Sequence, residues 1–164
     1  LSPMQFSDPQ LHSCVLESLA QAGLPADYLE LEVTESTLMS DTEATIDMLN
    51  TLRDTAVHIA LDDFGTGYSS LSCLKRMPLN LLKIDQAFVN GLPDDLEDMA
   101  IARAILAMAK SLHLRVTAEG VETPQQAQAL AAMGCDLLQG YHFGRPMPAK
   151  DMTALLASRR PNSQ

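Results

Sequence analysis

Apolar residues along the chain follow two alternating spacings, one typical of helices and the other of strands. Apolar side chains that recur about every four positions predict helices at 8–23, 40–54, 97–112 and 123–134. Short apolar runs with β-branched residues predict strands at 29–33, 57–61, 81–84, 114–118 and 135–138. The pattern therefore predicts five strand-then-helix units.

Capping residues mark the ends of several predicted helices. Asp8-Pro9 supplies an N-cap and a first-turn proline for the first helix, which Gly23 ends. Ser40–Glu43 and Thr123–Gln126 have the spacing of capping boxes, and Gly134 ends the last of these helices.

The alternation predicts an α/β fold, because strands joined by helices pair in parallel through right-handed crossovers. Two architectures remain, an open doubly wound sheet and a (β/α)₈ barrel. Polar residues end or follow every predicted strand: Glu32 with Glu35, Asp62 with Asp63, Lys83 with Asp85, Glu119 with Glu122, and Gln139. A doubly wound sheet binds its ligand at one switch point, whereas a barrel gathers residues from all its strand ends. Five contributing strands favour the barrel.

Composition narrows the class of protein. The 164 residues hold 11 Lys and Arg against 21 Asp and Glu, a net charge of −10, which argues against binding to polymeric nucleic acid. The three cysteines, Cys14, Cys73 and Cys135, lie far apart and are expected to be free and buried. No apolar run approaches the roughly 20 residues of a membrane span, so we expect a cytoplasmic location.

The most informative segment runs from Asp62 to Ser70 (DDFGTGYSS). Two adjacent carboxylates repel each other unless a cation lies between them, and all-oxygen ligands indicate Mg²⁺ or Mn²⁺ rather than Zn²⁺. A simple acidic helix cap is the competing interpretation, but the carboxylates of Glu32 and Glu119 on other strands favour a metal site. The glycines of this segment lack the lysine of a nucleotide triphosphate loop.

Two further segments carry candidate chemistry. Lys83 lies inside an apolar strand, where it either forms a plain salt bridge or holds a water molecule near the metals. Gln139, Gly140, Tyr141 and Phe143 suit hydrogen bonding to a base and stacking on it, although such aromatic residues more often belong to a core. His142 is less favoured as a general base, because a metal can activate water without it.

Together these segments resemble the EAL domain, the bacterial phosphodiesterase family that acts on cyclic di-GMP. The signature loop from Asp62 to Leu71 is followed at the family's spacing by Leu82–Asp85 (LKID), Ala118–Thr123 (AEGVET) and Gln139–Tyr141 (QGY). The resemblance covers Leu1 to about Pro148. It implies a (β/α)₈ barrel whose mouth binds two Mg²⁺ or Mn²⁺ ions and hydrolyses cyclic di-GMP to linear pGpG.

The resemblance also implies roles for individual residues. Metal ligands would be Glu32, Asp62, Asp63 and Glu119. Glu119 and Lys83 would be catalytic, the first ligating or orienting the attacking water and the second positioning it. Substrate-binding or supporting contacts would come from Gln139, Gln5, Asp85, Gly140 and Phe143, while Glu35 and Glu122 would support loops.

The chain departs from the family pattern at its beginning. The Glu of the motif that names the family and an Asn that precedes Leu1 in the family are not in the sequence. A barrel of roughly 250 residues would place about 156 in five units, so residues 1–158 are expected to be the C-terminal part of one EAL domain, followed by a polar tail at 159–164. The expected fold is thus a barrel with about five of its eight units, inactive by itself and either oligomeric or poorly folded.

The resemblance suggests partners as well. We expect a homodimer and, in the parent protein, an upstream sensor or GGDEF-type domain with a possible membrane anchor. The alternative function is a receptor or dimerisation module that binds cyclic di-GMP without hydrolysing it.

Overall fold

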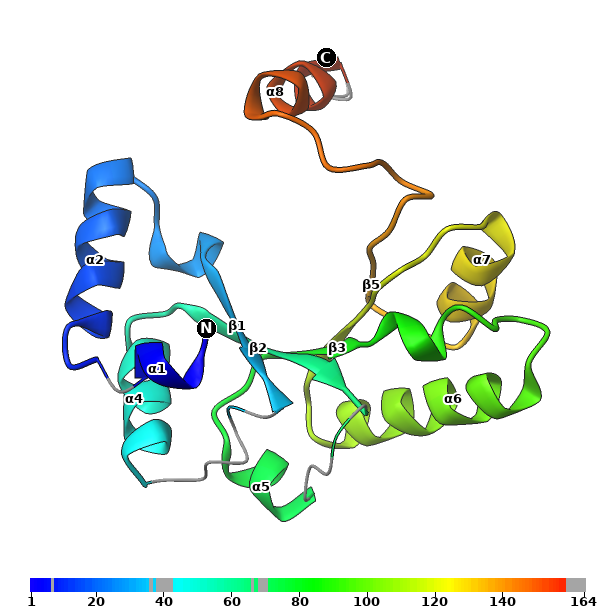
Figure 1. Cartoon of the computed structure of the whole chain (residues 1–164), viewed down its shortest axis with the longest axis horizontal. Helices are drawn as coiled ribbons and strands as arrows, with labels where there is room; N and C mark the ends of the chain where they lie inside the picture. The colour runs from blue at the N-terminus through cyan, green and yellow to red at the C-terminus, as the bar shows by residue number, and fades with distance from the viewer. Residues whose placement is uncertain (7, 36, 38–42, 66, 68–70, 159–164) are drawn as a thin grey trace.

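The computed structural model describes residues 1–6, 8–35, 37, 43–65, 67 and 71–158. Its centre is one parallel sheet of five strands (Figure 1). The strands are β1 (Glu30–Thr34), β2 (His58–Phe64), β3 (Leu81–Ile84), β4 (Arg115–Ala118) and β5 (Leu137–Leu138). The helices are α1 (Pro3–Phe6), α2 (Leu11–Ala22), η1 (Ala26–Tyr28), α4 (Glu43–Asp54), α5 (Leu71–Arg76), η2 (Gln86–Phe88), α6 (Leu96–Ser111), α7 (Pro124–Ala132) and α8 (Ala149–Ser158).

The order of the strands distinguishes between the two predicted architectures. Each strand pairs in parallel with the next one along the chain, in the order β1-β2-β3-β4-β5. A doubly wound sheet reverses its strand order at a switch point, whereas a (β/α)₈ barrel does not. The α/β class and an incomplete barrel of five strands are therefore confirmed.

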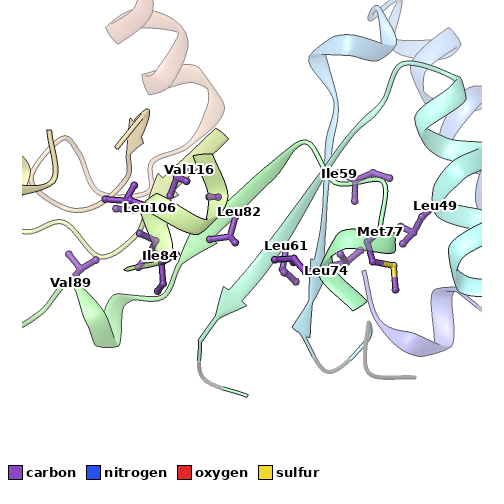
Figure 2. Close-up of a cluster of buried hydrophobic side chains, with 14 of the residues drawn as sticks. Leu49, Ile59, Leu61, Leu74, Met77, Leu82, Ile84, Val89, Leu106 and Val116 are labelled. Atoms are coloured by element: carbon purple, nitrogen blue, oxygen red, sulfur yellow. The ribbon is translucent and has the colours of Figure 1, made fainter. Parts of the chain in front are cut away.

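The two faces of the sheet have different surroundings. Ile59, Leu61, Leu82, Ile84 and Val116 belong to the buried cluster in Figure 2, which also contains side chains of α4, α5 and α6. Because strand side chains alternate between faces, the residues between these apolar positions lie on the opposite face. That face corresponds to the interior of a barrel, and it carries the charged residues of the candidate site.

Most predicted elements are confirmed, with shifts at their ends. The first helix begins at Leu11 rather than at Asp8, whose carboxylate accepts the N–H of Gln10 at 2.8 Å, and it ends at Gly23 with φ 61°. The second strand continues past its predicted end through Asp62 and Asp63 to Phe64, and the fifth has only two residues. The capping box predicted at 40–43 lies largely outside the described residues.

The capping box at the start of α7 is present as predicted, and its glutamine does more than cap. The side chain of Thr123 accepts the N–H of Gln126, whose Oε1 accepts the N–H groups of Thr123 and Glu122 at 2.9 and 2.8 Å. The buried Nε2 of Gln126 also donates to the carbonyl of Val89 at 3.2 Å. This amide therefore ties the start of α7 to the segment that follows η2.

The expectation of buried cysteines is wrong for Cys14, which is exposed, and Cys135 is only half-buried. Cys14 precedes Val15, which α2 buries together with Leu19, so Cys14 falls on the outer face of that helix.

At the other end of the chain, α8 lies apart from the sheet in Figure 1 and buries none of its side chains. None of the described helices is long and apolar enough to cross a membrane.

Candidate active site

Lys83 is the centre of the charged cluster on the inner face of the sheet. Its Nζ lies 2.5 Å from Oε1 of Glu32, 2.7 Å from Oε1 of Glu119 and 3.1 Å from Oδ1 of Asp62. The three carboxylates come from β1, from the end of β4 and from β2, whereas the lysine comes from β3. Four neighbouring strands thus bring their charged side chains to one point at the carboxyl end of the sheet, as the sequence predicted.

The surroundings of Lys83 and Glu119 shift the pKa values of both groups. Burial alone would lower the pKa of Lys83, whose side chain is 5% exposed, but the hydrogen bonds that its ammonium donates to Glu119, Glu32 and Asp62 raise that pKa above its ordinary value. Burial raises the pKa of Glu119, and the charges of Asp62 and Glu32 add to this, against the lowering effect of Lys83. Lys83 is therefore a fixed cation at neutral pH.

Asp62 and Asp63 reach the same site because β2 carries a bulge there. Leu61 pairs with Leu82 and Phe64 pairs with Ile84, so two residues of β2 stand opposite the single residue Lys83. A regular strand would send adjacent side chains to opposite faces, and the extra residue removes this constraint. Asp63 adopts φ 55°, in the left-handed region, and its N–H donates to Oδ1 of Asp62 at 3.1 Å.

Asp63 is paired with a second acid. Its pKa is raised by burial, by the charge of Asp62, and by both the charge and a side-chain hydrogen bond of Asp85, with a smaller opposing effect of Lys83. Two carboxyl groups in hydrogen-bond contact share a proton or need a cation between them. The structure thus brings together two of the predicted site residues in an arrangement that attracts a positive charge.

One group of three carboxylates has the spacing of a metal site. Asp62, Asp63 and Glu119 each offer an oxygen atom, and these atoms all lie within 4.8 Å of one another. A set of hard oxygen ligands fits a divalent cation such as Mg²⁺, Mn²⁺ or Ca²⁺. The fourth predicted ligand, Glu32, is outside this group, and its Oε1 contacts Lys83 instead.

Glu35 supports the loop that follows β2. Its carboxylate is buried, and Oε2 accepts the N–H groups of Gly65 at 3.4 Å and Gly67 at 3.1 Å. A Cβ atom added to Gly67 would lie 2.9 Å from Cδ of Glu35, so a larger residue would displace the Glu35 carboxylate. The predicted loop-supporting position of Glu35 agrees with these contacts, while Thr66 and Tyr68–Ser70 lie outside the described residues.

A cavity of about 320 Å³ adjoins the carboxylates. Its lining contains the predicted residues Asp63, Asp85, Glu119, Glu122, Gln139 and Gly140. Gly140 is required for packing, because a Cβ atom there would lie 2.1 Å from the carbonyl oxygen of Val121. The sequence reasoning missed Gln86 and Gly120, which also line the cavity; the position of Gln86 directly after the LKID segment was the available signal.

An arginine lies over the ring of an aromatic residue that lines this cavity. Tyr141 lines it and is half exposed, and the guanidinium carbon of Arg145 lies 4.4 Å from the centre of the Tyr141 ring. An arginine stacked on an aromatic ring holds that ring in place and adds a positive charge beside it. Arg145 was not predicted from the sequence, because nothing in the residues around it indicates the stack.

Among the described residues, Gln5, His142 and Phe143 belong neither to the charged cluster around Lys83 nor to the cavity lining. The Oε1 of Gln5 accepts the N–H of Ser2 at 2.8 Å, which makes a local turn in α1. The rings of His142 and Phe143 contact each other edge to face with centres 4.9 Å apart, outside the cavity lining. The carboxylates, Lys83 and the Gln139–Tyr141 segment are therefore the candidate site, and the roles of all these residues, like those of Gln5 and Phe143, remain predictions.

The profile of the EAL domain matches residues 1–146, which is most of the chain. The chain belongs to the EAL domain family. Its described part therefore supplies strands β1 to β5 and the carboxyl-end residues of an EAL barrel.

Named relatives agree with this membership. The chain is 51% identical over 146 residues to the cyclic di-GMP phosphodiesterase NbdA of Pseudomonas aeruginosa, covering 89% of this chain and 19% of that protein. It is 47% identical over 157 residues to the bifunctional diguanylate cyclase/cyclic di-GMP phosphodiesterase MucR of the same species, covering 96% of this chain and 23% of MucR. The chain thus spans about a fifth of the length of these curated relatives.

Solved structures show the same fold with ligands. The PaMucR phosphodiesterase in complex with c-di-GMP has a TM-score of 0.87 at 47% identity, over 93% of this EAL chain and 62% of that one. The manganese and cyclic di-GMP complex of Klebsiella pneumoniae BlrP1 has a TM-score of 0.80 at 33% identity, over 87% of this chain and 36% of that one. With these relatives and its own carboxylate group, the EAL chain has the features of a divalent-metal site.

Proposed function

We propose that this EAL chain carries the site at which its protein hydrolyses cyclic di-GMP to linear pGpG with the help of Mg²⁺ or Mn²⁺. In this reaction a water oxygen forms a new bond to one phosphorus, one phosphorus–oxygen ester bond breaks, and the leaving sugar oxygen takes up a proton. The observation that carries the proposal is the group of oxygen atoms from Asp62, Asp63 and Glu119 within 4.8 Å of one another.

The carboxylates fit the proposed metal ions by their chemistry and position. Asp62, Asp63 and Glu119 would bind the ions, and Glu32 would join them once its contact with Lys83 is exchanged for a metal contact. Bound metal ions lower the pKa of coordinated water and neutralise charge on the phosphate. This chemistry also accounts for how a chain with a net charge of −10 accepts an anionic substrate.

Lys83 and Glu119 are the proposed catalytic pair. Lys83 keeps its proton, so it acts as a hydrogen-bond donor that orients the attacking water and not as a base. Glu119 lies 2.7 Å from that ammonium and lines the cavity, so it can hold the same water from the other side. The arrangement positions the nucleophile next to the phosphate instead of creating a covalent intermediate.

The cavity beside the carboxylates is the proposed binding place for a guanine base. Tyr141 offers an exposed ring for stacking, and Gln139 and Asp85 offer an amide and a carboxylate for hydrogen bonding. Stacking on an aromatic ring stabilises a bound base by about 1–3 kcal/mol. Contributions from Glu122 and Gly140 would be indirect, through the shape of the cavity.

The experiment is a hydrolysis assay on the full-length protein with two matched variants. We expect Glu119→Ala to abolish the formation of pGpG and Glu97→Ala, at an exposed position of α6, to leave it unchanged. Undiminished turnover in Glu119→Ala would overturn the assigned role. Tight binding of cyclic di-GMP without any turnover in the wild-type protein would instead support a receptor.

Partners of the full-length protein belong to the same proposal. MucR is by its name also a diguanylate cyclase, and we propose a cyclase or sensor module in the full-length protein here too, together with pairing of two copies. Both are tested by the mass and domain content of the intact protein.

A further inference from the structure

A second concave surface lies between α6 and α7, away from the candidate active site. This groove has a volume of about 880 Å³, and none of its described lining residues also lines the cavity beside the carboxylates. It adjoins residues that precede β4 and β5, among them His113, Leu114 and Asp136. It therefore lies toward the amino ends of the strands, whereas the active site lies at their carboxyl ends.

The floor of the groove is apolar. Met99, Leu106, Leu114, Val116 and Met133 line it, and the exposed Ala107 and Ala132 leave room above this floor. Leu106 and Val116 are buried, whereas Met99, Leu114 and Met133 are partly exposed, so a partner could remove the remaining apolar surface of these three from water.

The rim of the groove carries more basic than acidic residues, whereas the chain as a whole is acidic. The whole chain has 21 acidic residues against 11 Lys and Arg, whereas the described lining of the groove has two cations, Arg103 and Lys110, and one acid, Asp136. A carboxylate oxygen of Asp136 already accepts the N–H of Val116 at 2.8 Å. The rim thus presents exposed cations to whatever enters the groove.

The helix dipole accounts for only part of this charge. Lys110 lies in the last turn of α6, where positive charge is favourable in any helix. Arg103 lies two turns earlier, beyond the reach of that effect, and it faces the same groove. A ligand with negative charge would pair with both Arg103 and Lys110.

The length of the groove indicates what kind of ligand fits. The lining residues of α6 extend from Met99 to Lys110, which is about 16 Å along a helix axis and matches about three turns of a second helix. We propose that the groove between α6 and α7 binds an amphipathic helix of a partner protein, with apolar residues on one face and acidic residues beside them. Its apolar face would cover the floor, and its carboxylates would pair with Arg103 and Lys110.

Two synthetic helical peptides test the proposal on the full-length protein. Both have leucines along one face; the first has flanking glutamates, and the second has lysines in their place. Fluorescence anisotropy should show that the glutamate peptide binds at least about tenfold more tightly, and that salt weakens this binding. Equal binding of the two peptides would overturn the proposal.

Variants of the chain locate the binding. We expect the double variant Arg103→Glu/Lys110→Glu to lose about tenfold in affinity for the glutamate peptide. Arg53→Glu/Lys150→Glu changes the net charge equally at exposed positions outside the groove and should bind as the wild type does. Equal losses in both double variants would contradict the assignment.

A third variant keeps the fold while it removes one rim group. His113 has φ 60°, a conformation that glycine adopts readily, so His113→Gly should preserve the end of α6. We expect this variant to bind the glutamate peptide a few fold more weakly. Sedimentation of the same variants tests the other occupant, a second copy of the chain. If Arg103→Glu/Lys110→Glu dissociates a dimer and the wild type binds neither peptide, the partner-helix proposal is overturned.

Discussion

The ammonium of Lys83 lies 2.7 Å from a carboxylate oxygen of Glu119, although the two residues belong to different strand-and-helix units. Two more carboxylates, from Glu32 and Asp62, lie within 3.1 Å of the same ammonium. One lysine therefore balances three acids at the carboxyl end of the sheet. In the proposed mechanism the same lysine orients water, so it supports both the fold of the site and its chemistry.

Replacing this lysine should separate stability from turnover. Lys83→Met leaves three acids facing one another, and we expect the metal-free protein to lose about 1–3 kcal/mol of stability. A divalent ion should restore part of that loss, because it supplies the missing positive charge, but hydrolysis should stay low.

Thermal melts with and without Mn²⁺ measure this effect, and Lys150→Met on α8 is the control. Unchanged stability of metal-free Lys83→Met would show that the three contacts contribute nothing.

The loop after β2 should depend on the absence of a side chain at position 67. Gly67→Ala forces a Cβ atom against the Glu35 carboxyl group. We therefore expect weaker metal binding and a decrease of about 1–3 kcal/mol in the free energy of unfolding. Gly144→Ala is the matched control, because no atom of the described residues lies within 4 Å of the added Cβ there. Calorimetric titration with Mn²⁺ and a denaturant melt check both effects; equal results for the two variants would contradict the account of Glu35.

Metal binding should weaken as the pH falls. The loss should begin at a higher pH than it would for carboxylates with ordinary pKa values. The pKa values of Asp63 and Glu119 are raised, chiefly by burial, and a metal ion binds their deprotonated forms. Protons therefore compete at a pH above the value of about 4 that is usual for Asp and Glu.

Asp85→Asn tests the direction of this effect. Removing the charge of Asp85 should lower the pKa of Asp63 and move the midpoint of metal binding to lower pH. A Mn²⁺ titration over a pH series measures that midpoint, and a shift to higher pH in the variant would be the contrary result.

The amide of Gln126 should stabilise the fold far more than its neighbour on the same helix. Gln126 is 5% exposed, and its side chain bonds backbone groups of Glu122, Thr123 and Val89. We expect Gln126→Ala to cost about 2–3 kcal/mol, because buried backbone groups lose their partners, and Gln128→Ala on the exposed side of α7 to cost less than about 0.5. Urea unfolding compares them, and equal midpoints would refute the role of the buried amide.

The sequence was sufficient for the class of fold and for the identity of the charged cluster. Alternating helix and strand spacings and a polar residue at each strand end led to a barrel with Lys83, Asp62 and Glu119 together. The route by which Asp62 and Asp63 both reach the site could not be predicted, because it depends on a bulge in the pairing of β2 with β3. Pairing register is a property of two strands, and neither strand shows it alone.

Other features depended on contacts between distant segments. The stack of Arg145 on Tyr141 and the bond from Gln126 to Val89 arise from the folded arrangement and leave no local spacing in the sequence. The helix start at Leu11 also differs from the expected N-cap at Asp8, because Asp8 uses its carboxylate for a turn before the helix.

The central claim is that the carboxylates around Lys83 form a metal-dependent site for cyclic di-GMP. The most direct test is the rate of pGpG formation by the metal-stripped full-length protein as Mn²⁺ is added back. We predict no product without metal, a rate that rises with Mn²⁺ until it saturates, and no rise at all in Glu119→Ala. Cleavage that persists in the stripped protein, or an equal rise in Glu119→Ala, would contradict the claim.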